Sequence, residues 1–238
     1  MHRTFISMTW TPGVDTEEAQ TLLHAIEDIY TILRPRFGVL GQFDPLPVVR
    51  VFGAWTLPSI PQDAAYANVE WYITKSLDDA HQSILASRYL EAIILEPWQA
   101  TNPHFDLALT DLPITDDISD QPPTSNVLGM SQPGMLSLIS SQPFKSIGHP
   151  ELRKLALRHT YFHYFGRLLD VPRIARTDDI LEHQGALYCT NTCALRFTDT
   201  PTLALSFAQQ EVAGGQLFCE TCQKDLAAQI AGFHFGTN

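Results

Sequence analysis

Cys189-Thr-Asn-Thr-Cys193 and Cys219-Glu-Thr-Cys222 are two close pairs that together contain all 4 cysteines of this chain of 238 residues. Each pair stands on a short turn whose backbone can direct both sulfurs at one point. Four thiolates around a zinc ion form a tetrahedral site with no open position, which is the arrangement of a structural metal site. The spacing therefore predicts that one structural zinc ion binds Cys189, Cys193, Cys219 and Cys222.

Two other interpretations of the cysteines stay open. All four could be buried free thiols, or Cys219 and Cys222 could form a redox pair at a helix N-terminus, which lowers the pKa of a thiol. The redox interpretation leaves Cys189 and Cys193 without a role. Disulfides are rare in reducing compartments, so we do not expect them in a cytoplasmic protein.

The composition is that of a soluble globule able to bury a substantial core, with 45% hydrophobic residues. The formal net charge is -11 and no basic run is present, so we expect no nucleic-acid partner. No window approaches the ~20 apolar residues that span a bilayer, and residues 1–10 lack the apolar centre of a signal peptide. We therefore expect a cytoplasmic protein that does not bind membranes.

Apolar residues recur at helical spacing in some segments and alternate in others, which predicts strands and helices in succession. The predicted helices are 15–33, 77–95, 149–170, 200–212 and a short one that begins near 219. The predicted strands are 48–55, 69–74, 105–110 and a hairpin of 126–130 with 135–140, whereas 113–124 and 170–186 are expected to be polar connections. This order favours an α/β (α+β) fold with a C-terminal helical subdomain stapled by the zinc site.

A pair of histidines lies on the predicted helix that begins near residue 149. His159 and His163 are at positions i and i+4, so their side chains project from one face. This is half of the zinc-peptidase motif His-Glu-x-x-His, in which the glutamate is the general base for the metal-bound water. Thr160 stands at the glutamate position, and a hydroxyl of ordinary pKa cannot accept that proton at neutral pH. Taken alone, such a pair is more often chance than a pair of ligands.

The run His159-Thr-Tyr-Phe-His163-Tyr-Phe-Gly166 resembles the metzincin signature His-Glu-x-x-His-x-x-Gly, and residues 188–196 and 218–226 resemble the archaemetzincin pattern. In that family a third His precedes the first Cys, a Met lies two residues after the second Cys, and a Cys-x-x-Cys pair completes a structural zinc site. Residues 126–140 resemble the family's edge hairpin, along which a peptide lies as an added strand.

The resemblance covers roughly residues 107–226. It implies a metzincin-like mixed twisted sheet with packing helices, in a single domain of residues 1–238. Within this domain, residues 1–170 would form the sheet and helix part with the histidine helix, and residues 171–238 would form the zinc-binding subdomain.

Three departures from the family pattern fall on the catalytic machinery. Thr160 replaces the general base, Tyr188 replaces the third His, and Leu195 replaces the Met beneath the metal. We therefore expect a metallopeptidase homologue that is a pseudoenzyme, keeps the structural zinc and binds a peptide or protein in the former cleft. The alternatives are an active zinc-dependent hydrolase with an altered ligand set, and a purely structural zinc-stabilised interaction module.

The sequence leaves open whether a second metal ion binds at the histidine helix. Besides Tyr188, the ligand set of His159 and His163 could be completed by Asp170 or His183, since a catalytic zinc needs about three protein ligands and an open position. Glu151 and Glu182 are the nearest carboxylates in sequence, and neither is favoured as a base. The remaining histidines are expected singly at the surface or at helix caps: His24, His81, His104, His149 and His234. The acidic cluster in 111–120 is expected to be a solvated loop.

Overall fold

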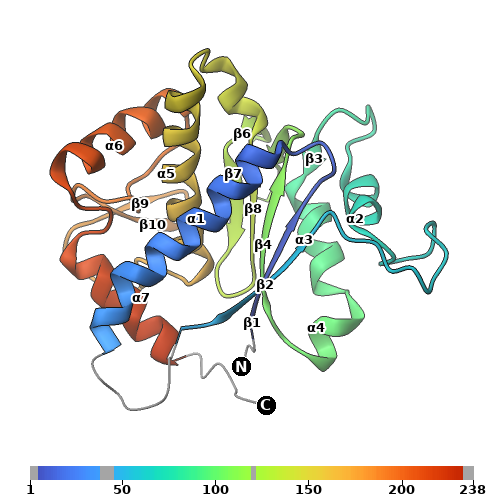
Figure 1. The fold of residues 1–238 in the computed structure, drawn as a ribbon, viewed down its shortest axis with the longest axis horizontal. Helices are drawn as coiled ribbons and strands as arrows, with labels where there is room; N and C mark the ends of the chain where they lie inside the picture. Colours follow the sequence, from blue (N-terminus) through green and yellow to red (C-terminus); the bar gives the residue numbers. More distant parts are fainter. Residues whose placement is uncertain (1–4, 38–45, 119–121, 233–238) are drawn as a thin grey trace.

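The alternating strands and helices form a five-stranded sheet between two layers of helices in a computed structural model that describes residues 5–37, 46–118 and 122–232 (Figure 1). The strand order is β2 (Val48–Gly53), β1 (Phe5–Trp10), β4 (Phe105–Thr110), β8 (Leu136–Ser140) and β7 (Gly129–Gln132). The first four are parallel neighbours, and the edge strand β7 runs antiparallel to β8. The predicted mixed α/β fold is confirmed.

One face of the sheet is covered by α1 (Thr16–Leu33) and α5 (Pro150–Leu168), and α6 (Pro201–Gly214) packs on the outside of α5 (Figure 1). Helix α7 (Glu220–Gly232) lies beside α1 and the 3-10 turn η1 (Arg34–Phe37). Asp15 caps α1 in a capping box with Glu18, in which each side chain accepts a backbone N–H at the start of the helix. Ile6 and Met8 of β1 are fully buried against this layer.

The opposite face is covered by α2 (Val69–Ser76), α3 (Ala86–Ile94) and α4 (Pro97–Thr101). Successive residues of a strand point to opposite faces, so Phe105, Leu107 and Leu109 face α1 and α5 while Ala108 joins a second core. A small sheet of β3 (Ile84–Leu85), β5 (Ile114–Asp116) and β6 (Thr124–Val127) flanks this layer. Both faces of the interior strands β1, β4 and β8 are therefore largely buried, whereas the edge strand β2 is mostly exposed.

Two element predictions on this face were wrong. Residues 69–74 form helix α2 because the Asn68 side chain accepts the backbone N–H of Trp71 and starts a helix, which outweighs the strand preference of β-branched and aromatic residues. The predicted helix 77–95 begins only at Ala86, since Asp78 accepts the N–H of Gln82 in a turn that leads into β3. Pro97 begins α4 rather than only ending a helix.

Three further segments also differ from expectation. The N-terminal segment supplies the interior strand β1, between β2 and β4, which we did not predict. The segment 113–124, predicted to be a solvated loop, contains β5, and Ile114 of this strand is fully buried. Asp117 accepts hydrogen bonds from Ser87 at the start of α3. Asp120 lies outside the described residues. The connection before the cysteines contains β9 (Ile180–His183), paired with β10 (Ala186–Cys189). A second 3-10 turn, η2 (Gln142–Ser146), precedes α5.

The core beneath α5 draws residues from both sides of residue 170, including Phe165, Leu195 and Leu226. The division into 1–170 and 171–238 stays a prediction. Within the described ranges, no helix is both long and apolar enough to cross a membrane.

A substitution at Gly129 would test how tightly β7 packs against α5. A Cβ atom at this position would lie 2.5 Å from the carbonyl oxygen of Leu138 and 2.8 Å from the ring of Tyr164. We expect Gly129→Ala to reduce the free energy of unfolding by about 2 kcal/mol, because backbone must move. Gly148→Ala is the control, since nothing lies within 4 Å there. Urea unfolding of both variants measures the difference, and equal stabilities would contradict this packing.

Candidate metal centre and histidine helix

The four cysteine sulfurs converge between β10 and the start of α7. All four are buried, each Sγ lies within 4.8 Å of the others, and the Sγ atoms of Cys189 and Cys219 are 3.7 Å apart. A tetrahedral zinc ion with Zn–S bonds of about 2.3 Å places its sulfurs about 3.8 Å apart. Hydrogen bonds among the sulfurs lower the pKa of Cys189, to about 7, and that of Cys219, whereas they raise the pKa of Cys193 and Cys222. The cluster therefore fits a zinc ion with four sulfur ligands.

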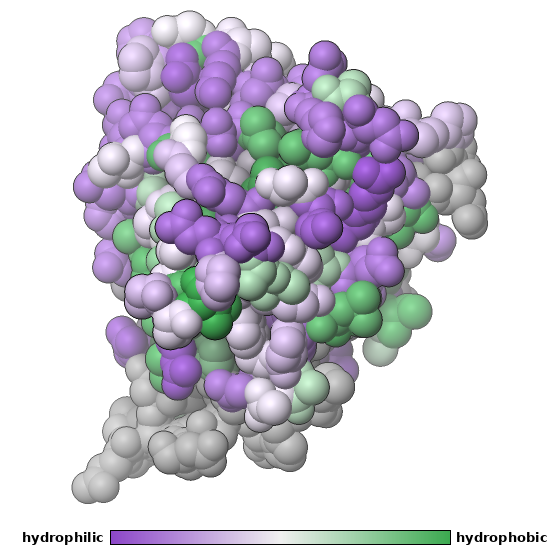
Figure 2. All heavy atoms as spheres, turned by 90° about the vertical axis from the view of Figure 1, so that its right-hand side faces the viewer, coloured by the Kyte–Doolittle hydropathy of each residue, from purple (hydrophilic) through white to green (hydrophobic). Residues whose placement is uncertain are grey.

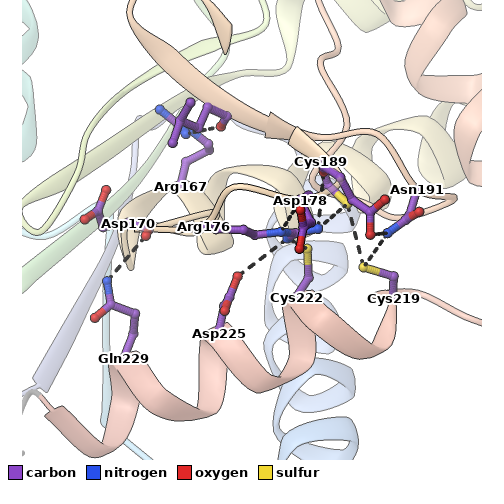
Figure 3. A network of polar contacts seen from close by, with 12 residues as sticks. Arg167, Asp170, Arg176, Asp178, Cys189, Asn191, Cys219, Cys222, Asp225 and Gln229 are labelled. Atoms are coloured by element: carbon purple, nitrogen blue, oxygen red, sulfur yellow. Dashed lines mark hydrogen bonds and ion pairs between the residues drawn. The ribbon is translucent and has the colours of Figure 1, made fainter. Parts of the chain in front are cut away.

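Arg176 points its guanidinium at this cluster from the connection that precedes β9 (Figure 3). Its Nη1 donates to Cys222 Sγ at 3.2 Å, and its Nη2 donates to Cys189 Sγ at 3.7 Å. Asn191 Nδ2 lies 3.8 Å from Cys219 Sγ. Hydrogen bonds to metal-bound sulfur orient the ligands and offset the negative charge of four thiolates. Sequence spacing gave no signal for Arg176, because it lies outside both cysteine motifs.

The guanidinium of Arg176 is itself fixed by its neighbours. Its Nε donates to the carbonyl oxygen of Asp178 at 2.7 Å, and its Nη2 donates to that of Asp179 at 3.2 Å. Asp225, on the same side of α7 as Cys222, places Oδ2 3.5 Å from Nη1 (Figure 3). Arg176 thus links the connection before β9, the cysteine sulfurs and α7.

His163 keeps the features of a metal ligand. Its Nδ1 donates to the carbonyl oxygen of Ala194 at 3.1 Å, the contact that fixes ring orientation in metal-binding histidines. Burial lowers the pKa of His163 to about 3, with the positive charge of Arg167 contributing, so the imidazole is neutral. Its ring stacks on that of Tyr188, with centroids 5.9 Å apart.

His159 is engaged at both ring nitrogens. Its Nδ1 lies 3.0 Å from each carboxylate oxygen of Glu211 on α6, and its Nε2 lies 3.4 Å from Thr198 Oγ1. The side chains of His159 and Glu211 are almost completely buried. A metal at Nε2 would have to displace the Thr198 hydroxyl. Among the described residues, no cluster of three or more His, Cys, Asp or Glu ligands includes either histidine.

The residues at the other catalytic positions also have internal partners. Thr160 Oγ1 donates to the carbonyl oxygen of Ala156 within α5 at 3.0 Å. Burial raises the pKa of Tyr188, so its phenol stays protonated at neutral pH. The Arg167 guanidinium lies 5.1 Å from the Tyr188 ring centroid and donates to the carbonyl oxygen of Leu187. A protein cation therefore stands beside the residue that replaces the third histidine.

The remaining candidates for this region do not join the histidine pair. The ring of His183 packs on Phe197, with centroids 4.2 Å apart. Asp170 follows α5 and accepts a hydrogen bond from Gln229 at its backbone carbonyl. Glu151 and Glu182 are exposed. Leu195, at the methionine position, is fully buried under the helix, and a Cβ at Gly166 would lie 2.3 Å from Leu195 Cδ2.

One of the single histidines was assigned wrongly. His24, His81 and His149 are exposed as expected, and His234 lies outside the described residues. His104 is only 4% exposed and lies 3.2 Å from Glu96 and 3.5 Å from Asp106. His104 and Asp106 share a face at the start of β4 because side chains two apart point the same way. That alternation was a usable signal, whereas Glu96, at the start of α4, was not predictable from it.

The Arg176 contacts generate a prediction about zinc affinity. We expect Arg176→Ala to weaken zinc binding by roughly 10- to 100-fold, as loss of outer contacts to metal ligands does elsewhere. Arg173→Ala is the matched control, because Arg173 is exposed and close in sequence. Competition with a chromogenic chelator measures both constants. Equal affinities in the two variants would show that Arg176 does not support the metal.

Two solved structures resemble this fold. Archaemetzincin from Methanopyrus kandleri aligns with a TM-score of 0.57 at 13% identity, over 96% of each chain. A zinc-dependent peptidase from Methanocorpusculum labreanum aligns with a TM-score of 0.56 at 11% identity, over 93% of this chain and 99% of that one. No protein-family model and no curated protein matches the sequence. The resemblance to archaemetzincins is thus confirmed at the level of the fold.

Proposed function

We propose that this chain is a non-catalytic member of the peptidase-like fold that holds a structural zinc ion on its four cysteines and binds a peptide or protein along β7. The observation that carries the proposal is the stack of His163, Tyr188 and Arg167. The Tyr188 ring, at the sequence position of the family's third histidine, stacks on the ring of His163, and the Arg167 guanidinium lies 5.1 Å from the Tyr188 ring centroid. This nearby positive charge supports the proposal because it disfavours a bound metal ion.

Loss of the general base supports this proposal independently. A peptidase of the His-Glu-x-x-His type needs a carboxylate to take the proton of the metal-bound water. The hydroxyl of Thr160 has neither the basicity nor the orientation for this role, since it donates into its own helix. The carboxylate of Glu211 faces Nδ1 of His159, on the side of the ring away from Nε2.

The edge position of β7 supports the peptide-binding part of the proposal. Among the described residues β7 pairs with one strand, β8, and we propose that an added strand pairs with its other side. The hairpin is held to α5, because Ser137 Oγ donates to the carbonyl oxygen of Tyr164 at 2.9 Å and Ser131 Oγ lies 2.5 Å from Ser137 Oγ. Binding by strand addition needs this fixed edge but no catalytic group.

A second candidate, a zinc hydrolase with an altered ligand set, is favoured by one observation. The neutral ring of His163 with Nδ1 bound to a carbonyl is oriented as in a metal ligand. The side chains around His163 are less suited to act as further metal ligands. Both ring nitrogens of His159 already have contacts, and Arg167 adds positive charge nearby.

Metal content distinguishes the two functions. We expect the zinc content per chain to fall by one in Cys189→Ser and to stay unchanged in His159→Ala and His163→Ala, with His24→Ala as the exposed control. Elemental analysis of dialysed protein measures this. We also expect no turnover of a quenched fluorescent peptide library. A zinc lost with the histidines, or turnover abolished by His163→Ala, would establish the hydrolase instead.

Restoring the missing groups tests the stack directly. We expect Thr160→Glu with Tyr188→His to gain a weakly bound zinc ion and little activity. Adding Arg167→Leu should tighten that zinc at least about tenfold, because it removes a nearby cation. Isothermal titration with Zn²⁺ compares the double and triple variants. If the triple variant binds no more tightly than the double variant, Arg167 does not prevent metal binding.

A further inference from the structure

A second group of buried ionisable residues lies across the sheet from the histidine helix. It adjoins a cavity of about 440 Å³ between the sheet and the layer of α2, α3 and α4. Figure 2 shows the molecule from the side of this layer, where hydrophobic patches interrupt a mostly hydrophilic surface. Aromatic side chains form part of the cavity wall, together with polar groups such as Arg50 and Asn102, and they are Phe5, Phe52, Trp55, Tyr72, Tyr89 and Trp98.

Glu96, His104 and Asp106 line this cavity and converge on one point. His104 Nε2 lies 3.2 Å from Glu96 Oε1 and 3.5 Å from Asp106 Oδ1, and one ligand atom from each residue lies within 4.8 Å of the others. Ligands bound at about 2.1 Å to one metal ion are themselves about 3.0–3.4 Å apart. The distances from His104 Nε2 to the two carboxylates are close to this range, and a small shift of the Asp106 side chain would bring all three groups onto a single ion.

Each of the three groups is oriented by a neighbour through its other polar atom. His104 Nδ1 donates to the carbonyl oxygen of Asn102 at 2.9 Å, which leaves Nε2 facing the two carboxylates. Tyr72 donates to Glu96 Oε2 at 2.7 Å. Gln99 Nε2 donates to Asp106 Oδ2 at 2.8 Å. Outer hydrogen bonds of this kind are characteristic of metal ligands, because they fix the tautomer and the direction of the donor atom.

The contact between Glu96 and His104 depends on where the His104 ring carries its proton. Glu96 is 4% exposed, and its Oε1 lies 3.2 Å from His104 Nε2 and accepts no hydrogen bond from another described residue. With the ring proton on Nδ1, where it is donated to Asn102, Nε2 brings no hydrogen to Oε1, and a buried, unsatisfied carboxylate oxygen is costly. A cation bound at this position would satisfy Oε1 and offset the two adjacent carboxylates.

We propose that Glu96, His104 and Asp106 bind a divalent transition-metal ion, such as Mn²⁺ or Zn²⁺, with its open coordination positions directed into the aromatic cavity. Two carboxylates and one imidazole are hard and intermediate donors, suited to these ions. A cavity of this size beside the ion admits water or a small organic ligand that carries an oxygen or nitrogen donor. This site is separate from the cysteines and from His159 and His163.

The competing interpretation is a structural ion triad, in which a protonated His104 bridges the two carboxylates. Metal binding and this triad differ in one measurable respect. The triad predicts that the group takes up no metal ion, whereas the metal site predicts saturable binding that depends on all three side chains.

The test is a titration of the zinc-loaded, full-length protein with Mn²⁺ and separately with Zn²⁺, followed by calorimetry, with free Mn²⁺ also counted by electron paramagnetic resonance. Mn²⁺ discriminates between sites because thiolates bind it poorly. The variants are His104→Gln and Asp106→Asn, with His24→Ala as the exposed control. Circular dichroism and thermal unfolding of each variant report whether the fold is retained.

We expect one additional ion of at least one of the two metals to bind per chain, and to bind at least tenfold more weakly in either site variant but unchanged in His24→Ala. If neither ion binds the original protein beyond the cysteine site, the triad interpretation holds and the proposal is overturned. Binding that folded His104→Gln and Asp106→Asn both retain would also overturn it. Loss of the extra ion in Asp106→Asn alone, with His104→Gln unfolded, supports it.

Discussion

Burial of the C-terminal half of α5 on all sides is the constraint on which the rest of the structure depends. Every residue from His159 to Leu168 is buried between the sheet, α1 and α6. A helix buried all round must satisfy its polar side chains within the protein. His159 does so with Glu211, and Arg167 with the carbonyl oxygen of Leu187. The same packing that stabilises this helix therefore engages the side chains on which a peptidase would assemble its metal.

The partners of α5 come from the segment that the cysteines hold in place. Ala194, which accepts from His163, lies between Cys193 and Leu195, and the backbone N–H of Cys189 donates to the carbonyl oxygen of Leu195 at 2.8 Å. A metal bound to the four sulfurs would fix this segment, and with it the environment of the histidine helix. In the proposed function, the structural zinc preserves the packing rather than supplying chemistry.

Local motifs made part of this architecture predictable from sequence. Cap residues, cysteine spacing and the i, i+4 histidines act over a few residues, and they located α1, α5 and the cysteine cluster. The features that the sequence did not predict depend on contacts between residues that are far apart in the chain. Glu211 reaches His159 across 52 residues, and Arg167 meets Tyr188 only because β10 returns beside α5. Likewise, Glu96 approaches His104 through the short helix α4, whose start at Pro97 the apolar pattern did not indicate.

The sheet separates two candidate ion sites of opposite chemistry. One consists of four soft sulfurs in a closed cluster, and the other consists of a nitrogen and two carboxylate oxygens beside a cavity. Closed sulfur sites stabilise a fold, whereas sites with open positions can bind and activate a ligand. The fold alone does not determine where chemistry takes place. In the two proposals, the metal ion with open coordination positions therefore lies on the α2 to α4 face of the sheet, opposite the histidine helix.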